Sequence, residues 1–182
     1  MKKTMCRKQL STNTSSTCIA VLYFLLVPFT GTSQTADNYF KQALLNDSLQ
    51  KFSSALQACN RAIAVNPGFA KAYYLRGKAC FHLKDYKGAI KDVNKAAQLH
   101  LQNENIYLVR AYARLALHEY AIAIQDFNKA IVFNPGNSLT WYHRGYTNLQ
   151  LHNKKKARTD FSKAIELGIK ESGDIVNGFE PE

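Results

Sequence analysis

The sequence is poor in residues that interrupt or cross-link a chain. Its 182 residues include four prolines, nine glycines, four cysteines and one tryptophan. Few prolines leave room for helices, because proline lacks the N–H that a helix interior needs. The cysteines form no C-x-x-C pair and no cysteine–histidine cluster with zinc-ligand spacing, which argues against a structural zinc site. We expect no metal ion and no cofactor.

Sequence signatures of catalysis are also absent. The chain holds no G-x-S-x-G nucleophile motif, no P-loop and no G-x-G-x-x-G fingerprint. The letters HEY at His118–Tyr120 lack the second histidine of a zinc-protease H-E-x-x-H motif. We therefore assign no catalytic residues and predict that the protein is not an enzyme.

The start of the chain contains no acidic residue before Asp37. Four lysines and arginines fall within the first eight residues, and the apolar run CIAVLYFLLVPF follows at 18–29. This run is shorter than the about 20 residues that cross a bilayer, so the pattern predicts a secretory signal peptide over residues 1–33. An uncleaved membrane anchor is the alternative. We expect an exported protein that is periplasmic or secreted, or membrane-anchored if the segment is retained.

What the chain does contain is an internal repeat of 34 residues. Stepping along the sequence by 34 meets one aromatic series, one series of small residues and two series of alanine alone. Eight alanines in two such series indicate a true structural repeat. The four series are Tyr39, Tyr73, Tyr107 and Trp141; Ala43, Gly77, Ala111 and Gly145; Ala55, Ala89, Ala123 and Ala157; and Ala62, Ala96, Ala130 and Ala164.

Within each repeat the apolar residues follow a helical period. Tyr73, Gly77 and Cys80 stand at i, i+4 and i+7, and the same spacing recurs sixteen residues later. Asn-Pro-Gly closes the first and third repeats, since proline cannot continue a helix. Each repeat is therefore predicted to be two helices joined by a tight turn. The predicted helices are 36–49 and 52–65, 70–83 and 86–99, 104–117 and 120–133, and 138–151 and 154–167.

The period and its alternation of small and large residues resemble the tetratricopeptide repeat (TPR). Small residues let two helices approach closely, and large residues fill the adjacent holes. One helix pair cannot bury its apolar stripe alone, so the pairs stack. The resemblance implies an all-α, right-handed superhelix of four helix–turn–helix repeats. We number them repeats 1 to 4, at residues 36–69, 70–103, 104–137 and 138–168, followed by a short tail or vestigial capping helix at 169–182.

The resemblance also implies a function. In this family the first helix of each pair lines a concave groove that holds a peptide or a segment of another protein. We therefore expect a non-catalytic adaptor, with lysines and a histidine able to receive a carboxylate and with Tyr112 and Tyr146 binding the partner. Packing alone is the alternative role for the fifth residue of each repeat. The predicted groove consists of Phe40, Leu44, Lys71, Tyr74, Lys78, Leu108, Tyr112, Tyr142, His143 and Tyr146.

One ligand class of the family is not expected here. Chaperone-binding members grip a C-terminal carboxylate with lysine and then asparagine at the fifth and ninth positions of one repeat. This chain has Phe40 and Leu44 there in repeat 1, and Tyr74 and Lys78 in repeat 2. The clamp is absent.

A basic surface offers an alternative function. The net charge is +11, and lysines gather at 84–95 and in the run KKKAR at 154–158. These residues could contact nucleic acid, anionic lipid or acidic polysaccharide through the convex face. Export makes nucleic acid a poor partner, and membrane contact is expected only through residues 1–33 or weak electrostatics. An uncapped repeat 4 could also support an oligomer.

Two further patterns bear on packing. Arg76, Arg110 and Arg144 each precede an aspartate by sixteen residues, which predicts ion pairs between helices rather than a row of ligand-binding arginines. Cys59 and Cys80 fall on core-facing positions of adjacent repeats. An exported protein permits a disulfide between them, and two buried thiols are the alternative that we favour.

Overall fold

The computed structural model describes residues 30–169, with side chains from Thr35 onward. Within this range the chain is all-helical, as predicted. Apart from the first two residues of α2, these helices belong to one compact unit that begins at Thr32. The helices are α2 (Thr30–Ser48), α3 (Phe52–Val65), α4 (Ala70–His82), α5 (Tyr86–Gln98), α6 (Glu104–Ala116), α7 (Tyr120–Phe133), α8 (Ser138–Gln150) and α9 (Lys154–Glu166).

Seven of the eight predicted helices agree with the structure to within one residue at each end. The exception is α2, which was predicted to begin at residue 36 and begins at Thr30. No proline separates these two positions, so nothing in the sequence stops the helix from extending. Residues 1–29, which hold most of the predicted signal peptide, and 170–182, which hold most of the predicted tail, lie outside the described residues.

The two helices of each repeat are joined by a turn that contains a left-handed residue. In repeat 2, Lys84 has a φ of 65°, and the N–H of Asp85 donates to the carbonyl of Cys80 at 2.9 Å. This six-residue hydrogen-bonded closure is the Schellman motif, which usually places glycine at the left-handed position. Here four larger residues hold that conformation at the same point of each repeat: Gln50, Lys84, His118 and His152.

The Asn-Pro-Gly sequences form the loops between repeats, as predicted. Asn66 ends α3 with an extended backbone, and its side-chain oxygen accepts a hydrogen bond from the N–H of Gly68 at 3.0 Å. Asn134 and Gly136 repeat this contact at 3.2 Å after α7. In each loop the asparagine side chain thus stabilises the turn that contains the following proline and glycine.

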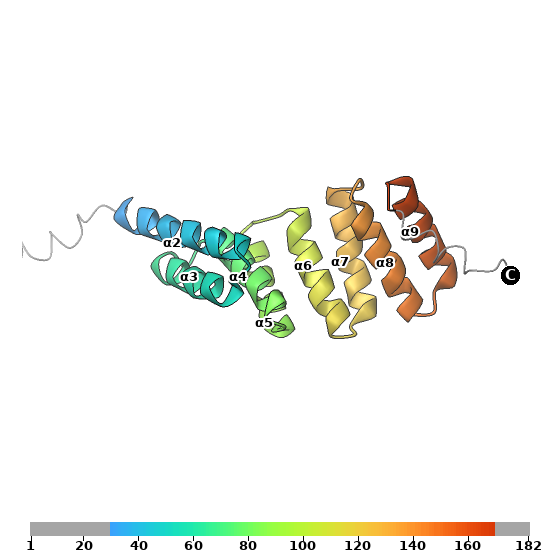
Figure 1. Ribbon diagram of the computed structural model, residues 1–182, viewed down its shortest axis with the longest axis horizontal. Helices are drawn as coiled ribbons and strands as arrows, with labels where there is room; N and C mark the ends of the chain where they lie inside the picture. Colours follow the sequence, from blue (N-terminus) through green and yellow to red (C-terminus); the bar gives the residue numbers. More distant parts are fainter. Residues whose placement is uncertain (1–29, 170–182) are drawn as a thin grey trace, which may run out of the picture. The chain divides into compact units, whose positions relative to one another are not determined.

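Alanine lines the closest approaches between helices. All eight residues of the two alanine series have no exposed surface. At Gly77 an added methyl group would lie 2.9 Å from Cγ2 of Val93 and 3.1 Å from the carbonyl oxygen of Ala89, so α4 and α5 almost touch there. The successive helices from α3 to α9 contact one another in chain order, and Figure 1 shows this arrangement from α4 to α9. The small residues thus set the spacing of the stack.

Three arginine–aspartate pairs join the two helices of repeats 2, 3 and 4, as the sixteen-residue spacing predicted. Each arginine also donates to an asparagine on the second helix of the preceding repeat, a contact that was not predicted. In repeat 2, Arg76 lies 2.6 Å from Asp92 and 2.7 Å from Asn60. The same geometry recurs for Arg110 with Asp126 and Asn94, and for Arg144 with Asp160 and Asn128. We call each such set an arginine bridge.

The arginine and aspartate of each bridge are mostly shielded from water, whereas Asn60 and Asn128 are exposed. The hydrogen bond from Arg76 to Asp92 raises the pKa of the Arg76 guanidinium. The contacts of the asparagines could also have been predicted from the sequence, because residues 60, 94 and 128 are all asparagine and lie 34 apart.

The two cysteines of the described region are free thiols. Cys59 and Cys80 are both buried, and burial raises their pKa values to about 12 and about 11. They therefore stay protonated and pack as small apolar side chains, which agrees with the favoured alternative. None of the helices in residues 30–169 combines the length and apolar character that crossing a bilayer requires.

Candidate partner-binding surface

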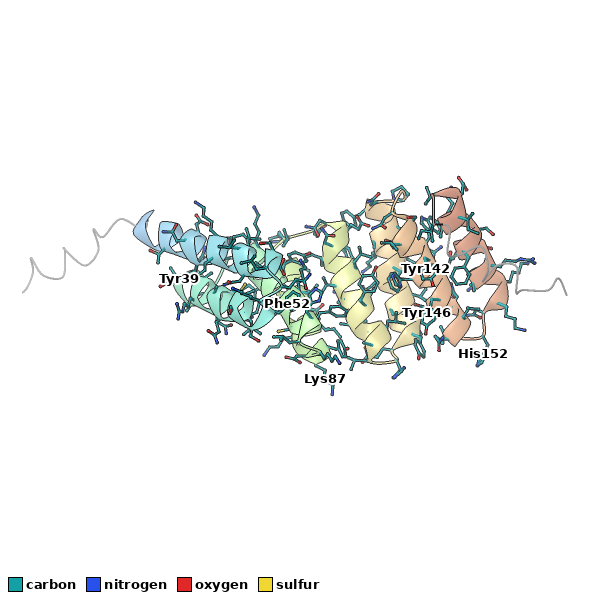
Figure 2. The ribbon with its side chains drawn as sticks, in the orientation of Figure 1. Tyr39, Phe52, Lys87, Tyr142, Tyr146 and His152 are labelled. Atoms are coloured by element: carbon teal, nitrogen blue, oxygen red, sulfur yellow. The ribbon has the colours of Figure 1, made fainter. Side chains whose placement is uncertain are left out.

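The first helices of the repeats carry the predicted groove, and α8 presents exposed apolar side chains within it. Leu139, Tyr142 and Tyr146 stand at i, i+3 and i+7, so they share one face of α8. Leu139 is 55% exposed, Tyr146 is 43% exposed and Tyr142 is half-buried. Figure 2 shows Tyr142 and Tyr146 on this helix. We call these three residues the α8 stripe.

Leu139 was missing from the predicted groove. It occupies the second position of repeat 4, where repeat 2 has the exposed Lys71 that was included. Testing the second position in every repeat would have found it, since the remaining two repeats have Asp37 and Asn105 there. A leucine at an exposed position that is polar in the other three repeats indicates an interaction surface.

Tyr112 belongs more to the core than predicted. Its ring packs against Phe127 with centroids 5.6 Å apart and against His143 at 4.9 Å. Burial, followed by the charge of Glu104, raises the pKa of Tyr112 to about 12. Replacing Tyr112 would therefore disturb packing as well as any bound partner.

His143 is half-buried in the same aromatic cluster. Burial lowers its pKa, because a charged imidazolium loses hydration there. It lies 5.4 Å from Tyr142, whose ring in turn lies 5.5 Å from Phe161. A neutral imidazole is a weak receptor for a carboxylate, so His143 fits a packing role better than the predicted charge-binding role.

The fifth residues of repeats 1 to 3 are half-buried and pack against core residues. Phe40 lies 4.9 Å from Phe69, Tyr74 packs beside Val93 and Ile106, and Leu108 packs beside Phe127. Burial is the main cause of a raised pKa at Tyr74. These contacts agree with the packing alternative for this position.

Lys78 is already paired. Its Nζ atom lies 2.7 Å from Oδ2 of Asp47, a residue of α2 that is 31 positions earlier. A ligand carboxylate at Lys78 would compete with this aspartate. Lys71 is exposed, and Leu44 is also largely exposed on α2.

The basic residues of the alternative surface lie on the second helices. Lys87, Lys91 and Lys95 are exposed along α5, and Lys154, Lys155 and Lys156 are exposed at the start of α9. Figure 2 marks Lys87 at the N-terminal end of α5. Lys91 and Lys95 also line a hollow of ≈ 490 Å³ beside Tyr73. Among the residues described, no group of histidine, cysteine, aspartate or glutamate could hold a metal ion.

The end of the stack is polar where the other repeats are apolar. Leu56, Ile90 and Ile124 occupy the twenty-first position of repeats 1 to 3, and repeat 4 has the exposed Arg158. An exposed arginine favours solvent over another helix at this point of α9. Self-association through repeat 4 stays a prediction.

Comparisons with known proteins agree with this architecture. Two family models described as Tetratricopeptide repeat match residues 40–104 and 139–167. The structure of MamA 41-end from Desulfovibrio magneticus RS-1 has a TM-score of 0.69 at 19% identity, covering 76% of this chain and 77% of that one. At such identity the likeness shows the fold.

Two smaller TPR structures are also similar. The Arabidopsis OM64 TPR domain has a TM-score of 0.62 at 24% identity, covering 64% of this chain and 96% of that one. The first TPR of Spaghetti (RPAP3), bound to the HSP90 peptide SRMEEVD, has a TM-score of 0.63 at 22% identity, covering 66% and 95% respectively.

Proposed function

The chain is a tetratricopeptide repeat protein, and we propose that it is a non-catalytic adaptor that binds a segment of another protein on the first helices of its repeats. TPR domains mediate protein–protein interactions, and the fold is typically non-catalytic. The observation that carries the proposal is the α8 stripe, where a leucine and a tyrosine are open to solvent on one helix face. Tyrosine at such a surface is a frequent binding hot spot.

The partner segment is apolar or aromatic rather than a C-terminal carboxylate. The one lysine at a clamp position, Lys78, is held by Asp47, and the asparagine that should accompany it is absent. The structural neighbour with bound SRMEEVD therefore suggests where a peptide lies, but its ligand is not carried over. An aliphatic or aromatic side chain would cover Leu139 and Tyr146.

A peptide selection tests this proposal. Displayed random peptides are selected on the protein, and the affinity of an enriched peptide is measured by fluorescence anisotropy. The double variant Leu139→Ser/Tyr146→Ser should bind at least about tenfold more weakly, because hot-spot truncations cost upwards of ~1 kcal/mol. Both residues are exposed, so the melting temperature should stay close to that of the wild type.

A matched control uses exposed apolar residues elsewhere. Val132 on α7 and Leu45 on α2 are both exposed, and neither belongs to the α8 stripe. The double variant Val132→Ser/Leu45→Ser should keep full affinity. Equal losses in both double variants, or no loss in the first, would show that the peptide binds elsewhere.

Export is the second part of the proposal. The basic start and the apolar run at 18–29 support a signal peptide that ends at residue 33, with the adaptor working in the periplasm or outside the cell. N-terminal sequencing of protein recovered from cell fractions tests this. A first residue near Gln34 in the exported fraction supports cleavage, whereas an intact Met1 in the membrane fraction supports the anchor.

The basic-surface alternative predicts a different response. Contacts with nucleic acid, anionic lipid or acidic polysaccharide weaken steeply with salt, while apolar contacts at the α8 stripe do not. Charge reversal of Lys154 and Lys155 to glutamate should leave peptide affinity unchanged. A large loss would favour the basic surface.

A further inference from the structure

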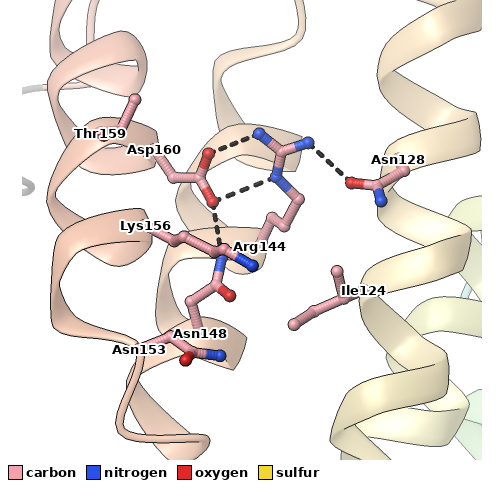
Figure 3. Close-up of a pocket in the computed structure, with 8 residues that line it drawn as sticks. All are labelled: Ile124, Asn128, Arg144, Asn148, Asn153, Lys156, Thr159 and Asp160. Carbon is pink, nitrogen blue, oxygen red and sulfur yellow. Dashed lines mark hydrogen bonds and ion pairs between the residues drawn. The ribbon is translucent and has the colours of Figure 1, made fainter.

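A polar hollow of ≈ 340 Å³ lies between α7, α8 and α9. Figure 3 shows Asn128 on one side, Asp160 and Lys156 on the other, and Arg144 and Asn148 between them. Asn148 stands two residues from Tyr146, which places it about 200° away around α8. The hollow therefore faces away from the α8 stripe.

Asn148 contributes an unpaired hydrogen-bond acceptor. The residue is 3% exposed, and its Nδ2 atom donates to Oδ2 of Asp160 at 2.9 Å. A carboxylate only accepts, so this bond fixes which end of the amide faces Asp160. The Oδ1 atom is buried and pairs with no group in the described part of the chain. Figure 3 shows it turned to the side of the hollow lined by Ile124.

In repeat 3 a side chain of the protein itself, Arg114, occupies the equivalent space. Arg114 lies 34 residues before Asn148, and its Nη1 atom donates to Oδ2 of Asp126 at 2.6 Å. Asn148 makes the corresponding contact with Asp160 but has a shorter side chain. The room that the guanidinium occupies in repeat 3 is thus open in repeat 4, and an acceptor replaces a donor there.

The rim of the hollow also carries different residues in these two repeats. Repeat 3 has Ile122 and Gln125 where repeat 4 has Lys156 and Thr159. The Oδ1 atom of Asn128 accepts from Arg144 at 2.7 Å, which leaves its Nδ2 to donate. The hydroxyl of Thr159 donates to the carbonyl oxygen of Lys155. The hollow of repeat 4 therefore presents the donors of Lys156 and Asn128 at its rim and the unpaired acceptor of Asn148 at its base.

The charges of the hollow select the ligand. Arg144 and Lys156 outweigh the single carboxylate of Asp160, so a cation is disfavoured. An anion could reach Lys156 but would leave the acceptor of Asn148 unpaired, at a cost in free energy. An amide group is neutral and carries both a donor and an acceptor. It matches the base and the rim together.

We propose that this hollow is a second binding site that takes an amide group, whose N–H donates to Asn148 and whose carbonyl oxygen accepts from Lys156. The Oδ1 atom of Asn148 is buried, so the ligand reaches it only after the exposed side chain of Lys156, which lies across the hollow in Figure 3, moves aside. The amide comes either from the peptide backbone of a bound segment or from an asparagine or glutamine side chain. The site is independent of the α8 stripe.

Two small probes separate these sources. N-acetylglycine N-methylamide offers backbone amides alone, and N-acetylglutamine N-methylamide adds a side-chain amide. Each is titrated into ¹⁵N-labelled protein while the side-chain NH₂ signals of Asn148 and Asn128 are followed. We expect saturable shifts with half-saturation on the order of 1 mM, as suits ligands of this size. A response to both probes indicates backbone recognition, and a response to glutamine alone indicates side-chain recognition.

Repeat 3 supplies an internal control in the same spectrum. Asn94 occupies the position of Asn128 and also lines a hollow beside Lys91 and Lys95, but among the described residues no buried unpaired acceptor lies there. Its NH₂ signal should not move. Shifts of equal size at Asn94 and Asn128, or shifts that fail to saturate, would overturn the proposal.

The substitution Asn148→Arg copies repeat 3 into repeat 4. It keeps a donor for Asp160, fills the hollow and removes the unpaired acceptor, so probe binding should disappear while the melting temperature stays level or rises. Asn105→Arg, at an exposed site on α6, adds the same charge elsewhere and should leave binding unchanged. Retained binding in Asn148→Arg would overturn the proposal.

A second variant decides the outcome if Asn148→Arg fails to fold. Lys156→Met keeps the length of an exposed side chain and removes the rim donor. We expect binding to weaken at least threefold with an unchanged melting temperature. Unchanged binding would show that Lys156 does not hold the ligand and would overturn the proposal.

Discussion

Repeat 1 and repeat 3 share a backbone arrangement but differ in what joins their two helices. Repeat 3 has the half-buried Arg110 and Arg114 and the buried Asp126 at the junction, and repeat 1 has Gln42, Asn46 and Ala58 at the same positions. Both form a helix pair, and their second helices, α3 and α7, have the same length of 14 residues. The ion pairs are therefore not what makes a pair of helices fold, whereas the alanine series is common to both.

The largest effect should follow from removing the aspartate alone. Asp126 is 1% exposed and binds two guanidinium groups. Asp126→Ala leaves both cations without their partner and should lower the free energy of unfolding by about 3–5 kcal/mol. Urea denaturation followed by circular dichroism measures this loss.

Copying repeat 1 completely is the matched control. The triple variant Arg110→Gln/Arg114→Asn/Asp126→Ala removes the cations together with the carboxylate. We expect it to lose only about 1–2 kcal/mol, because no buried charge remains unpaired. A triple variant less stable than Asp126→Ala would mean that the arginines hold the helices by packing rather than by charge.

Enlarging the shared alanines should affect both kinds of repeat. Ala55 in repeat 1 and Ala89 in repeat 2 are fully buried at the same position. Ala55→Leu and Ala89→Leu should each lower the free energy of unfolding by about 1–3 kcal/mol, since the interior is close-packed. Thermal unfolding of the two variants compares them. A cost confined to Ala89 would show that repeat 1 packs loosely.

The turns offer a smaller effect of opposite sign. His152 holds a φ of 57°, a conformation that costs a side chain energy and glycine very little. His152→Gly should raise the free energy of unfolding by about 0.5–1 kcal/mol, because the relieved strain exceeds the added freedom of the unfolded chain. Gln50→Gly in repeat 1 should give the same gain. A loss in either variant would indicate that the original side chain makes a stabilising contact.

The smallest effect concerns pH in repeat 4. His143 stands where repeats 2 and 3 have Leu75 and Val109, and burial lowers its pKa. The unfolded chain then binds more protons than the folded one below the ordinary histidine pKa of about 6.5, so stability falls as the pH drops through that value. Melting temperatures between about pH 8 and 5.5 should decline less in His143→Val. Parallel curves would assign the decline to other groups.

Much of the fold could be predicted because it repeats. The helix pattern and the alanine contacts recur in all four repeats, and the arginine–aspartate pairs recur in three, so several copies of weak local evidence combine into one clear pattern. The left-handed residues in the turns were not predicted, because none of them is a glycine. They are Gln50, Lys84, His118 and His152. Their conformation comes from closing two packed helices, not from local preference.

The candidate binding surface was harder to predict because its residues do not repeat. Lys78 pairs with Asp47, a contact with no counterpart in the other repeats of the described region. Tyr112 and Tyr146 occupy the same position, yet one packs against Phe127 and the other is exposed. Residues at the same repeat position differ in exposure because the side chains around them differ. The repeat pattern of a single sequence does not show these three-dimensional neighbours.

The arginine bridges also bear on how such a chain can lengthen. Every bridge takes its aspartate from its own repeat and its asparagine from the one before. A duplicated copy of residues 104–137, inserted behind the original, would bring an arginine for the asparagine ahead of it and offer an asparagine to the arginine that follows. The hydrogen bonds at both new borders would form without any compensating mutation. Duplication of a whole repeat is therefore an accessible route by which this protein could acquire a longer helical stack.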